Sequence, residues 1–174
     1  MTSRGCPFQC AYCHVSKERF GRSEAGNIGE LRLKSVERVI QEIEILQSLG
    51  VRKIFIEDDS LLAKKGRIIK IFTLLKEKNM VLADVNGVNL VHLFKKTPHG
   101  LKPDREYLEL LYAAGLQQIV FPVESGSQRV LDKYATGKLN LEIMDVVELV
   151  KVAKRVGIIC PVNMMIGFPD ETEE

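Results

Sequence analysis

The sequence predicts an α/β protein built on a parallel sheet, because strand-like and helix-like patterns alternate along it. Apolar runs typical of strands begin near residues 51, 81, 116 and 158, and an amphipathic segment separates most of them. Strands joined by single helices at such separations favour parallel βαβ units. A doubly wound sheet and a barrel both remain open. In either fold, function belongs at the carboxyl ends of the strands.

The first half of the chain contains two predicted helices and two predicted strands. Apolar residues recur on one helical face from Ser35 to Leu49, and Gly50 follows as a stop signal. Residues 51–56 are rich in branched and aromatic side chains, which is typical of a strand. A helix is expected over 65–78 and a strand over 81–86.

The second half repeats the alternation after an irregular segment. Residues 86–102 are expected to form a flexible loop on the substrate side, and neither His92 nor His99 within it shows a partner pattern. A helix is expected to begin near Pro103, where proline suits the first turn, and to end at Gly115. The remaining expectations are a strand over 116–123, a helix over 141–156 and a buried apolar strand over 158–166.

Composition narrows the class of protein. The chain has 174 residues with 45% hydrophobic content, enough for one domain with a core and too apolar for a disordered chain. No stretch approaches the roughly 18 apolar residues of a membrane span. The formal net charge of +2 gives no clear nucleic-acid signal. Because the first residues lack the apolar core of a signal peptide, a cytoplasmic location is expected.

The four cysteines are the most informative residues. Cys6, Cys10 and Cys13 lie within eight residues, and Cys160 is far away in the predicted last strand. Such a cluster in a chain without a secretion signal favours a metal or iron–sulfur site over a disulfide framework. We expect Cys160 to be a small buried side chain and not a ligand.

Three thiolates on one short loop suit an iron–sulfur cluster. A four-iron cluster held this way keeps one iron open to a small-molecule ligand. A closed zinc site needs a fourth protein ligand, which His14 or Cys160 would have to supply with awkward geometry. A non-catalytic zinc or iron–sulfur module therefore remains the alternative to an enzyme. A barrel that binds a phosphate or nucleotide without a cluster would leave the three thiols unexplained.

Polar or glycine-rich segments follow the strands at the edge where function is expected. They are residues 57–60, 86–89, 124–127 and 167–171. A structural metal site would need only the cysteines, so polar segments at every strand end favour the enzyme.

The spacing Cys-x3-Cys-x2-Cys, with Tyr12 just before the third cysteine, resembles the signature of radical S-adenosylmethionine (SAM) enzymes. The segment before Phe8 is similar to the subgroup that carries cobalamin-binding domains, as are the stretches 86–89, 123–127 and 166–172. These matches occur in the expected order over nearly the whole chain.

The resemblance implies a partial (β/α)6 barrel of TIM type, truncated to about five parallel strands with outer helices. It implies one radical SAM core domain over residues 1–174, a fragment with its first strand mostly missing and its sixth absent. It also implies a [4Fe-4S] cluster on the three cysteines and reductive cleavage of SAM to a 5′-deoxyadenosyl radical. An electron donor such as flavodoxin or ferredoxin, and cobalamin in a longer parent protein, follow from the same likeness. The substrate stays unknown.

The resemblance also implies the residues that contact SAM. Tyr12 would lie near the adenine, and one of Glu57, Asp58 and Asp59 would hold the amino group, because acids accept hydrogen bonds from an ammonium. Glu124 and Ser125 would meet the ribose and methionine portions, with Arg129 or Lys138 as candidate partners of the carboxylate. Asn163, expected inside the barrel, and Gly167 would face the adenosine.

Overall fold

The computed structural model of the protein describes residues 1–15 and 29–172. Its centre is an open parallel sheet in which β3, β4 and β7 lie side by side, and the continuation of β7 into β8 pairs with β9. An isolated parallel bridge between Gln118 and Ile159 links the two parts. These strands are β3 (Lys53–Ile56), β4 (Val81–Asp84), β7 (Leu116–Gln118), β8 (Phe121–Glu124) and β9 (Val162–Met164).

The helices pack on one another in chain order: α2 against α3, α3 against α4, and α4 against α6. This row of neighbouring helices is the arrangement of the outer layer of a barrel, and it favours the partial barrel over a doubly wound sheet. The row consists of α2 (Val36–Ser48), α3 (Lys65–Leu75) with the 3-10 turn η1 (Lys76–Lys78), α4 (Arg105–Ala113) and α6 (Val146–Val156). In the described part of the chain, none of these helices has the length and apolar character that a membrane span requires.

The core lies between the sheet and this row of helices. Buried residues run almost continuously along β4 and β8, as expected for strands covered on both faces, and recur at helical spacing on α3 and α4. Each large apolar side chain removed from water contributes about 1.5–3 kcal/mol. The largest include Ile68, Phe72, Leu82, Leu108, Leu116 and Phe121.

Two helices begin later than the sequence predicts. Helix α4 begins at Arg105, because the Asp104 carboxylate accepts a hydrogen bond from Tyr107 N at 3.3 Å and Pro103 still belongs to a strand. Helix α6 begins at Val146, because Asp145 caps Glu148 N at 2.8 Å. An acidic N-cap satisfies backbone N–H groups that have no partner within the helix, so it fixes the first turn.

The expectation of a flexible loop over 86–102 is wrong. This segment contains the 3-10 helix η2 (Leu90–Leu93) and a hairpin of β5 (Phe94–Thr97) and β6 (Gly100–Pro103). Its apolar residues Val88 and Leu93 are fully buried. Their burial holds the segment against the carboxyl end of the sheet.

The two outer strands also differ from expectation. The strand β1 (Ser3–Arg4) pairs antiparallel with β2 (Arg32–Leu33) instead of extending the parallel sheet. The last strand, expected to be buried over 158–166, is regular only in β9, and all three β9 residues are exposed. An edge strand is open to solvent on one side, which explains why its apolar sequence does not guarantee burial.

Candidate functional site

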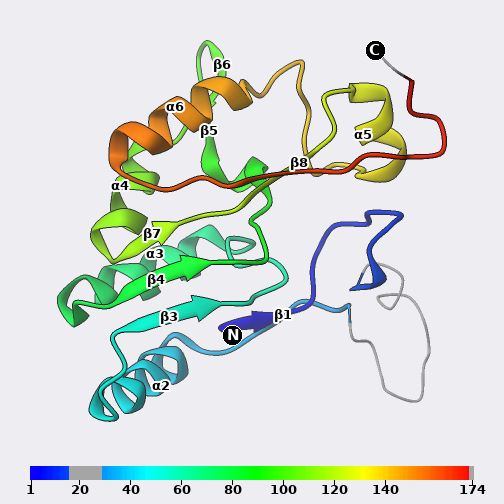
Figure 1. Ribbon diagram of the computed structural model, residues 1–174. Helices are drawn as coiled ribbons and strands as arrows, with labels where there is room; N and C mark the ends of the chain where they lie inside the picture. The colour runs from blue at the N-terminus through cyan, green and yellow to red at the C-terminus, as the bar shows by residue number, and fades with distance from the viewer. Residues whose placement is uncertain (16–28, 173–174) are drawn as a thin grey trace.

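The cysteine loop leaves β1 at the carboxyl end of the sheet, as the strand arrows and the blue segment in Figure 1 show. Gly5 has a φ of +80°, and a Cβ there would lie 2.1 Å from Glu30 O, so only glycine fits. Gly5 N donates to Asp59 Oδ2 at 2.7 Å. At the far end of the loop, Ala11 N donates to Tyr134 O at 2.8 Å. These contacts present the thiols from a loop anchored at both ends, and all four cysteines of the chain are free.

The three clustered cysteines line one cleft of about 310 Å³ at this end of the sheet. Four of the residues predicted from sequence to contact SAM lie in the same cleft, and they come from four different segments: Tyr12, Asp59, Glu124 and Asn163. Asn86, Gly87, Asn89, Pro122 and Lys138 complete much of its wall. The structure therefore brings together side chains that are up to 157 residues apart in sequence, from Cys6 to Asn163.

The three neighbouring acids that sequence analysis could not separate occupy different environments. Asp59 lines the cleft. Asp58 is fully buried, and its carboxylate accepts hydrogen bonds of 2.6 Å from Thr2 N, Thr2 Oγ1 and Ser3 Oγ. Glu57 is exposed and is absent from the lining of the cleft. Asp58 therefore ties β1 to the sheet, and Asp59 is the acid placed to meet a ligand.

Two further predicted residues lie in adjoining hollows. Ser125 lines a neighbouring pocket of about 660 Å³ with Gly126 and Ser127. Gly167 lines a third pocket of about 320 Å³ whose wall is aromatic, from Tyr12, Tyr134 and Phe168. The Tyr134 and Phe168 rings stack with centroids 4.9 Å apart. Tyr12 lines both this aromatic pocket and the cysteine cleft, so the two hollows adjoin at this residue.

An ion pair stands in the wall of the cleft. Lys138 Nζ lies 2.6 Å from Glu124 Oε1, and the two side chains are only 12% and 10% exposed. Glu124 has a φ of +69°, a left-handed conformation that costs energy for a residue other than glycine. Such strain at a strand end is typical of a functional position. Arg129, the other cation weighed for this role, instead donates to Asp170 O at 2.8 Å.

Burial changes the acidity of two groups in the cleft. Desolvation raises the pKa of Tyr12, and the nearby Cys10 and Glu124 raise it further, so the phenol stays protonated. Its hydroxyl is buried and has no hydrogen-bond partner among the residues that the structure describes. Burial also raises the pKa of the Cys10 thiol, while the Lys138 charge opposes the shift. The Tyr12 hydroxyl therefore lies in the cleft wall near Cys10 and Glu124, and its hydrogen-bonding capacity is not used within the described residues.

Two residues of the site carried no assigned role in the sequence analysis. Asn89 is 4% exposed, and its Nδ2 lies 3.9 Å from Cys6 Sγ and 2.8 Å from Ser60 Oγ. Asp84 is fully buried at the end of β4, where its Oδ2 accepts from Gly87 N at 3.1 Å and Val120 N at 3.0 Å. Both lie at or near the polar segment 86–89, which was the only signal that pointed to them.

The expectations for Cys160 and Asn163 hold only in part. Cys160 is partly buried against the core, and its Sγ donates to Ile158 O at 3.4 Å. Burial raises its pKa to about 11, which keeps the thiol protonated. Asn163 is exposed and not buried as expected, but it still lines the cleft because the inner face of β9 borders it.

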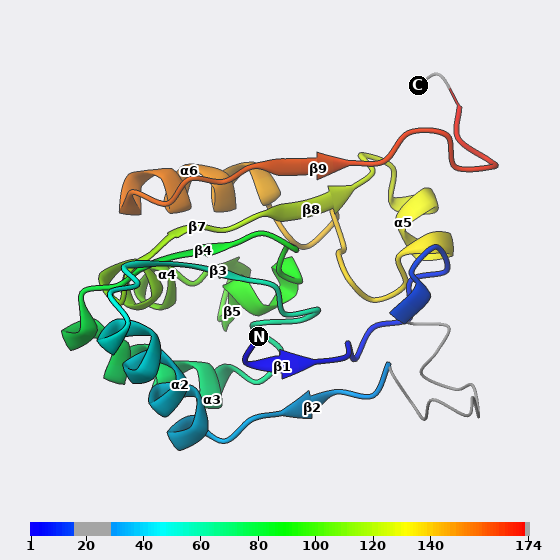
Figure 2. The ribbon, with the colours of Figure 1, turned by 60° about the horizontal axis from the view of Figure 1, so that its bottom comes forward.

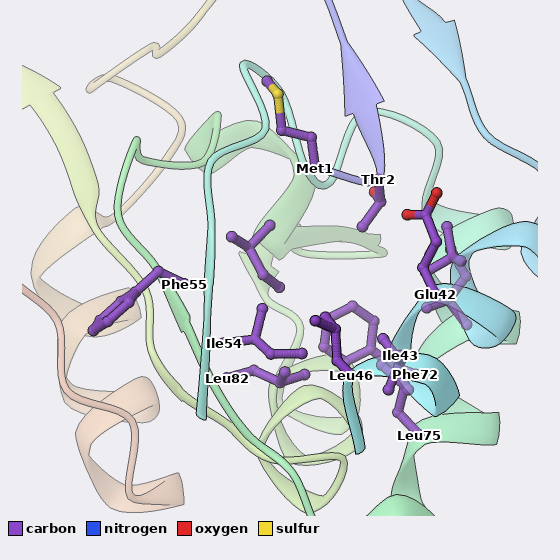
Figure 3. Close-up of a pocket in the computed structure, with 13 residues that line it drawn as sticks. Met1, Thr2, Glu42, Ile43, Leu46, Ile54, Phe55, Phe72, Leu75 and Leu82 are labelled. Carbon is purple, nitrogen blue, oxygen red and sulfur yellow. The ribbon is translucent and has the colours of Figure 1, made fainter. Parts of the chain in front are cut away.

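An apolar cavity of about 70 Å³ lies away from the cysteines, between α2, α3 and β3. Figure 3 shows the side chains of Leu46, Ile54 and Leu82 converging on it, whereas the Phe55 ring is turned away. Its wall contains alkyl and aromatic groups with Glu42 at the edge, so it offers no catalytic chemistry. Within the described ranges, no three His, Cys, Asp or Glu side chains are placed to hold a single metal ion.

The fold and the cysteine cleft define a class of enzyme that family comparison identifies. Residues 1–174 match the model of the radical SAM superfamily, and the chain belongs to this superfamily. The expected fold class, a partial barrel of radical SAM type, is confirmed by this match and by the structural neighbours.

The curated relatives transfer methyl or methylthio groups. The chain is 32% identical to an uncharacterized methyltransferase of Pyrococcus horikoshii and 29% identical to the cytidylyl-2-hydroxyethylphosphonate methyltransferase of Streptomyces wedmorensis. It is also 29% identical to the tRNA-2-methylthio-N(6)-dimethylallyladenosine synthase of a Sulfurihydrogenibium species. These alignments include 97–100% of this chain but only 28–36% of each relative. The chain thus spans about a third of the length of these relatives.

The structural neighbours share the fold at lower sequence identity. The radical SAM methyltransferase TsrM of Kitasatospora setae, solved with cobalamin and a [4Fe-4S] cluster, superposes with a TM-score of 0.73 and 19% identity. That match covers 98% of this chain and 31% of TsrM. The cobalamin-dependent radical enzyme OxsB gives a TM-score of 0.68 and 18% identity over 94% of this chain and 23% of OxsB.

Proposed function

We propose that residues 1–174 form one radical SAM core domain, in which Cys6, Cys10 and Cys13 hold a [4Fe-4S] cluster and the adjoining cleft binds SAM. One observation carries the proposal: three thiols of one loop line the same cleft as polar side chains from the ends of several strands. Thiolates are the ligands that iron–sulfur clusters take, and three of them leave one iron of four without a protein ligand. The donor set in this cleft therefore fits the cluster.

When bound, the cluster supplies the electron that cleaves SAM to methionine and a 5′-deoxyadenosyl radical, which takes a hydrogen atom from the substrate. The protein contributes binding, orientation and the exclusion of water. An electron donor of the flavodoxin or ferredoxin class would reduce the cluster again between turnovers. The substrate itself is not specified by the residues of the cleft.

Charge and position suggest how the chain would hold SAM. Asp59 offers a carboxylate to the ammonium of SAM, while Lys138 offers its ammonium to the carboxylate of SAM. Glu124, partner of Lys138, is assigned to the ribose hydroxyls of SAM, and Asn163 lines the same cleft from β9, where it pairs with Pro122. Ser125 would serve from the neighbouring pocket.

The adenine of SAM would occupy the aromatic pocket beside the cleft. Tyr12 and Phe168 have ring centroids 5.8 Å apart, and Gly167 lets the backbone approach closely. Flat aromatic walls suit a purine, and the contact of this pocket with the cleft at Tyr12 matches a ligand with a base at one end and an amino acid at the other.

Group transfer to an acceptor is the reaction class that the relatives support, because their names describe methyltransferases and methylthiotransferases. Cobalamin is proposed as a further cofactor of a protein containing this core, on the likeness to TsrM and OxsB. No described residue is assigned to cobalamin.

Anaerobic reconstitution with iron and sulfide tests the proposal. The reduced protein is expected to give the electron paramagnetic resonance (EPR) spectrum of a [4Fe-4S] cluster, and the spectrum is expected to change shape when SAM is added. Cys10→Ala should abolish the cluster, whereas Cys160→Ser is the matched control and should retain it. Tight binding of zinc without cluster uptake would instead support the non-catalytic module, and a cluster that ignores SAM would refute the SAM site.

A further inference from the structure

Asn89 is the buried amide nearest to the cysteine loop. Its side chain is 4% exposed, and Nδ2 lies 3.9 Å from Cys6 Sγ. A hydrogen bond to sulfur is longer than one to oxygen because the sulfur atom is larger. A thiolate has no proton to donate, so the amide must present its N–H₂ group, and not its carbonyl, to Cys6.

A second contact fixes the amide in this orientation. The same Nδ2 donates to Ser60 Oγ at 2.8 Å, and Ser60 is 1% exposed in the segment that follows β3. The two N–H bonds of the amide thus have separate acceptors, one in each of two loops. Asn89 also begins η2, whose residues Leu90 and Leu93 are buried, so its backbone has little freedom to move.

From these contacts we propose that Asn89 is a positioning residue that donates an N–H···S hydrogen bond to Cys6 and thereby raises the reduction potential of the cluster. The inference rests on the proposed function, because it concerns the cluster held by Cys6. Reduction adds negative charge that spreads onto the cysteine sulfurs. A donor already aimed at one sulfur stabilises the reduced form more than the oxidised form.

The size of the effect follows from hydrogen-bond energetics. Only the difference between the oxidised and reduced states shifts the potential, because both states keep the N–H···S bond. Loss of this bond is expected to lower the ratio of reduced to oxidised cluster about tenfold at a fixed potential, which is about 59 mV for a one-electron couple.

The experiment is an EPR-monitored redox titration of the reconstituted protein without SAM. Asn89→Leu removes the donor at similar volume and is expected to shift the midpoint to a more negative potential. Asn140→Leu is the matched control, because Asn140 is an asparagine outside the lining of the cleft, where its Oδ1 accepts a hydrogen bond from Glu142 N at 2.9 Å. Its midpoint should equal that of the wild type. Equal midpoints for the wild type and Asn89→Leu would overturn the proposal.

A second measurement reads the bond directly. Protein labelled with ¹⁵N at asparagine is expected to show a weak nitrogen coupling to the reduced cluster by pulsed EPR, and Asn89→Leu should lose it while Asn140→Leu keeps it. If Asn89→Leu does not take up iron, Asn89→Ala replaces it, since it removes the donor without adding charge or bulk. A wild type that forms no SAM-responsive cluster refutes the proposed function. A normal cluster without the coupling refutes only the role of Asn89.

Discussion

At the scale of single residues, the ion pair of Glu124 and Lys138 determines what removal of either charge costs the fold. Both side chains are about nine-tenths buried in the cleft wall, and each is the partner of the other. The attraction between two paired charges roughly offsets the free energy of removing both from water, whereas a single buried charge has no such compensation. The pair therefore stabilises the fold mainly by preventing an unpaired charge.

Removal of the cation alone should be costly. Lys138→Met is expected to lower the free energy of unfolding by about 3 kcal/mol, because the Glu124 carboxylate stays buried without its partner. The double variant Glu124→Gln with Lys138→Met should recover most of that loss. Urea denaturation of the wild type, both single variants and the double variant gives the coupling energy.

Lys133→Met is the control for this cycle. Lys133 forms an ion pair with Asp170 on an exposed surface, so its loss should change stability by less than about 1 kcal/mol. A Lys138→Met protein as stable as the Lys133→Met protein would contradict the role given to the buried pair.

Asp84 is a second buried acid with a distinct consequence. Burial raises its pKa to about 6, against the two backbone N–H groups of Gly87 and Val120 that lower it, and its Oδ1 has no partner in the described ranges. The unfolded carboxyl has a pKa of about 3.9. Because the folded state binds this proton more tightly, Asp84 favours folding below about pH 4, and that contribution is lost as the pH rises through 6.

Asp84→Asn should remove this pH dependence. Between pH 4 and pH 7.5, the stability of the wild type is expected to fall relative to the variant by about 3 kcal/mol, from a shift of roughly two pKa units. Urea unfolding of both proteins across this range measures the difference. A difference that stays constant, or that grows in favour of the wild type with rising pH, would show that Asp84 is ionised in the folded protein.

At the scale of elements, the turns between helices and strands decide how closely the layers pack. Gly50 follows α2 and Gly115 follows α4, and both have positive φ, +82° and +98°. Only Gly115 also faces a close neighbour: a Cβ there would lie 1.9 Å from Met80 O, whereas a Cβ at Gly50 would meet nothing within 4 Å. The turn after α4 thus brings the start of β7 close to Met80, at the end of the connection between α3 and β4.

The two glycines form a matched pair of substitutions. Gly50→Ala is expected to cost about 1–2 kcal/mol, the penalty of a left-handed conformation. Gly115→Ala should cost about 3 kcal/mol or more, because the backbone contact must also open. Thermal unfolding of both variants measures the difference, and equal losses would show that the β7 turn adjusts without strain.

At the scale of the whole molecule, the open sheet and its row of helices share a single core. Buried side chains from α2 through Ile158 belong to one continuous cluster. The ribbon in Figure 2 shows α2, α3 and α4 beside the same sheet. The cleft is assembled at one edge of this unit from segments spread over nearly the entire chain. We therefore propose that the described residues form one domain.

A single domain predicts one cooperative transition. Urea unfolding followed by far-ultraviolet circular dichroism and by fluorescence should give coincident curves. The fluorescence comes from tyrosine, because the chain has four tyrosines and no tryptophan. Two separated transitions would show that β8, β9 and the helix α5 (Gln128–Tyr134) unfold independently of the β3–β4–β7 sheet.

The sequence by itself determined the order of the main helices and strands, the parallel sheet and the cysteine site. Those features depend on local periodicity and on the chemistry of a compact motif, which neighbouring residues carry. Tertiary structure decided which of the three acids after β3 reaches the cleft, because the Asp58 carboxylate accepts hydrogen bonds from Thr2 and Ser3 instead. It also decided that 86–102 is ordered and that Asn89 meets Cys6 across 83 residues. Such contacts depend on how distant segments pack, and no local pattern records that packing.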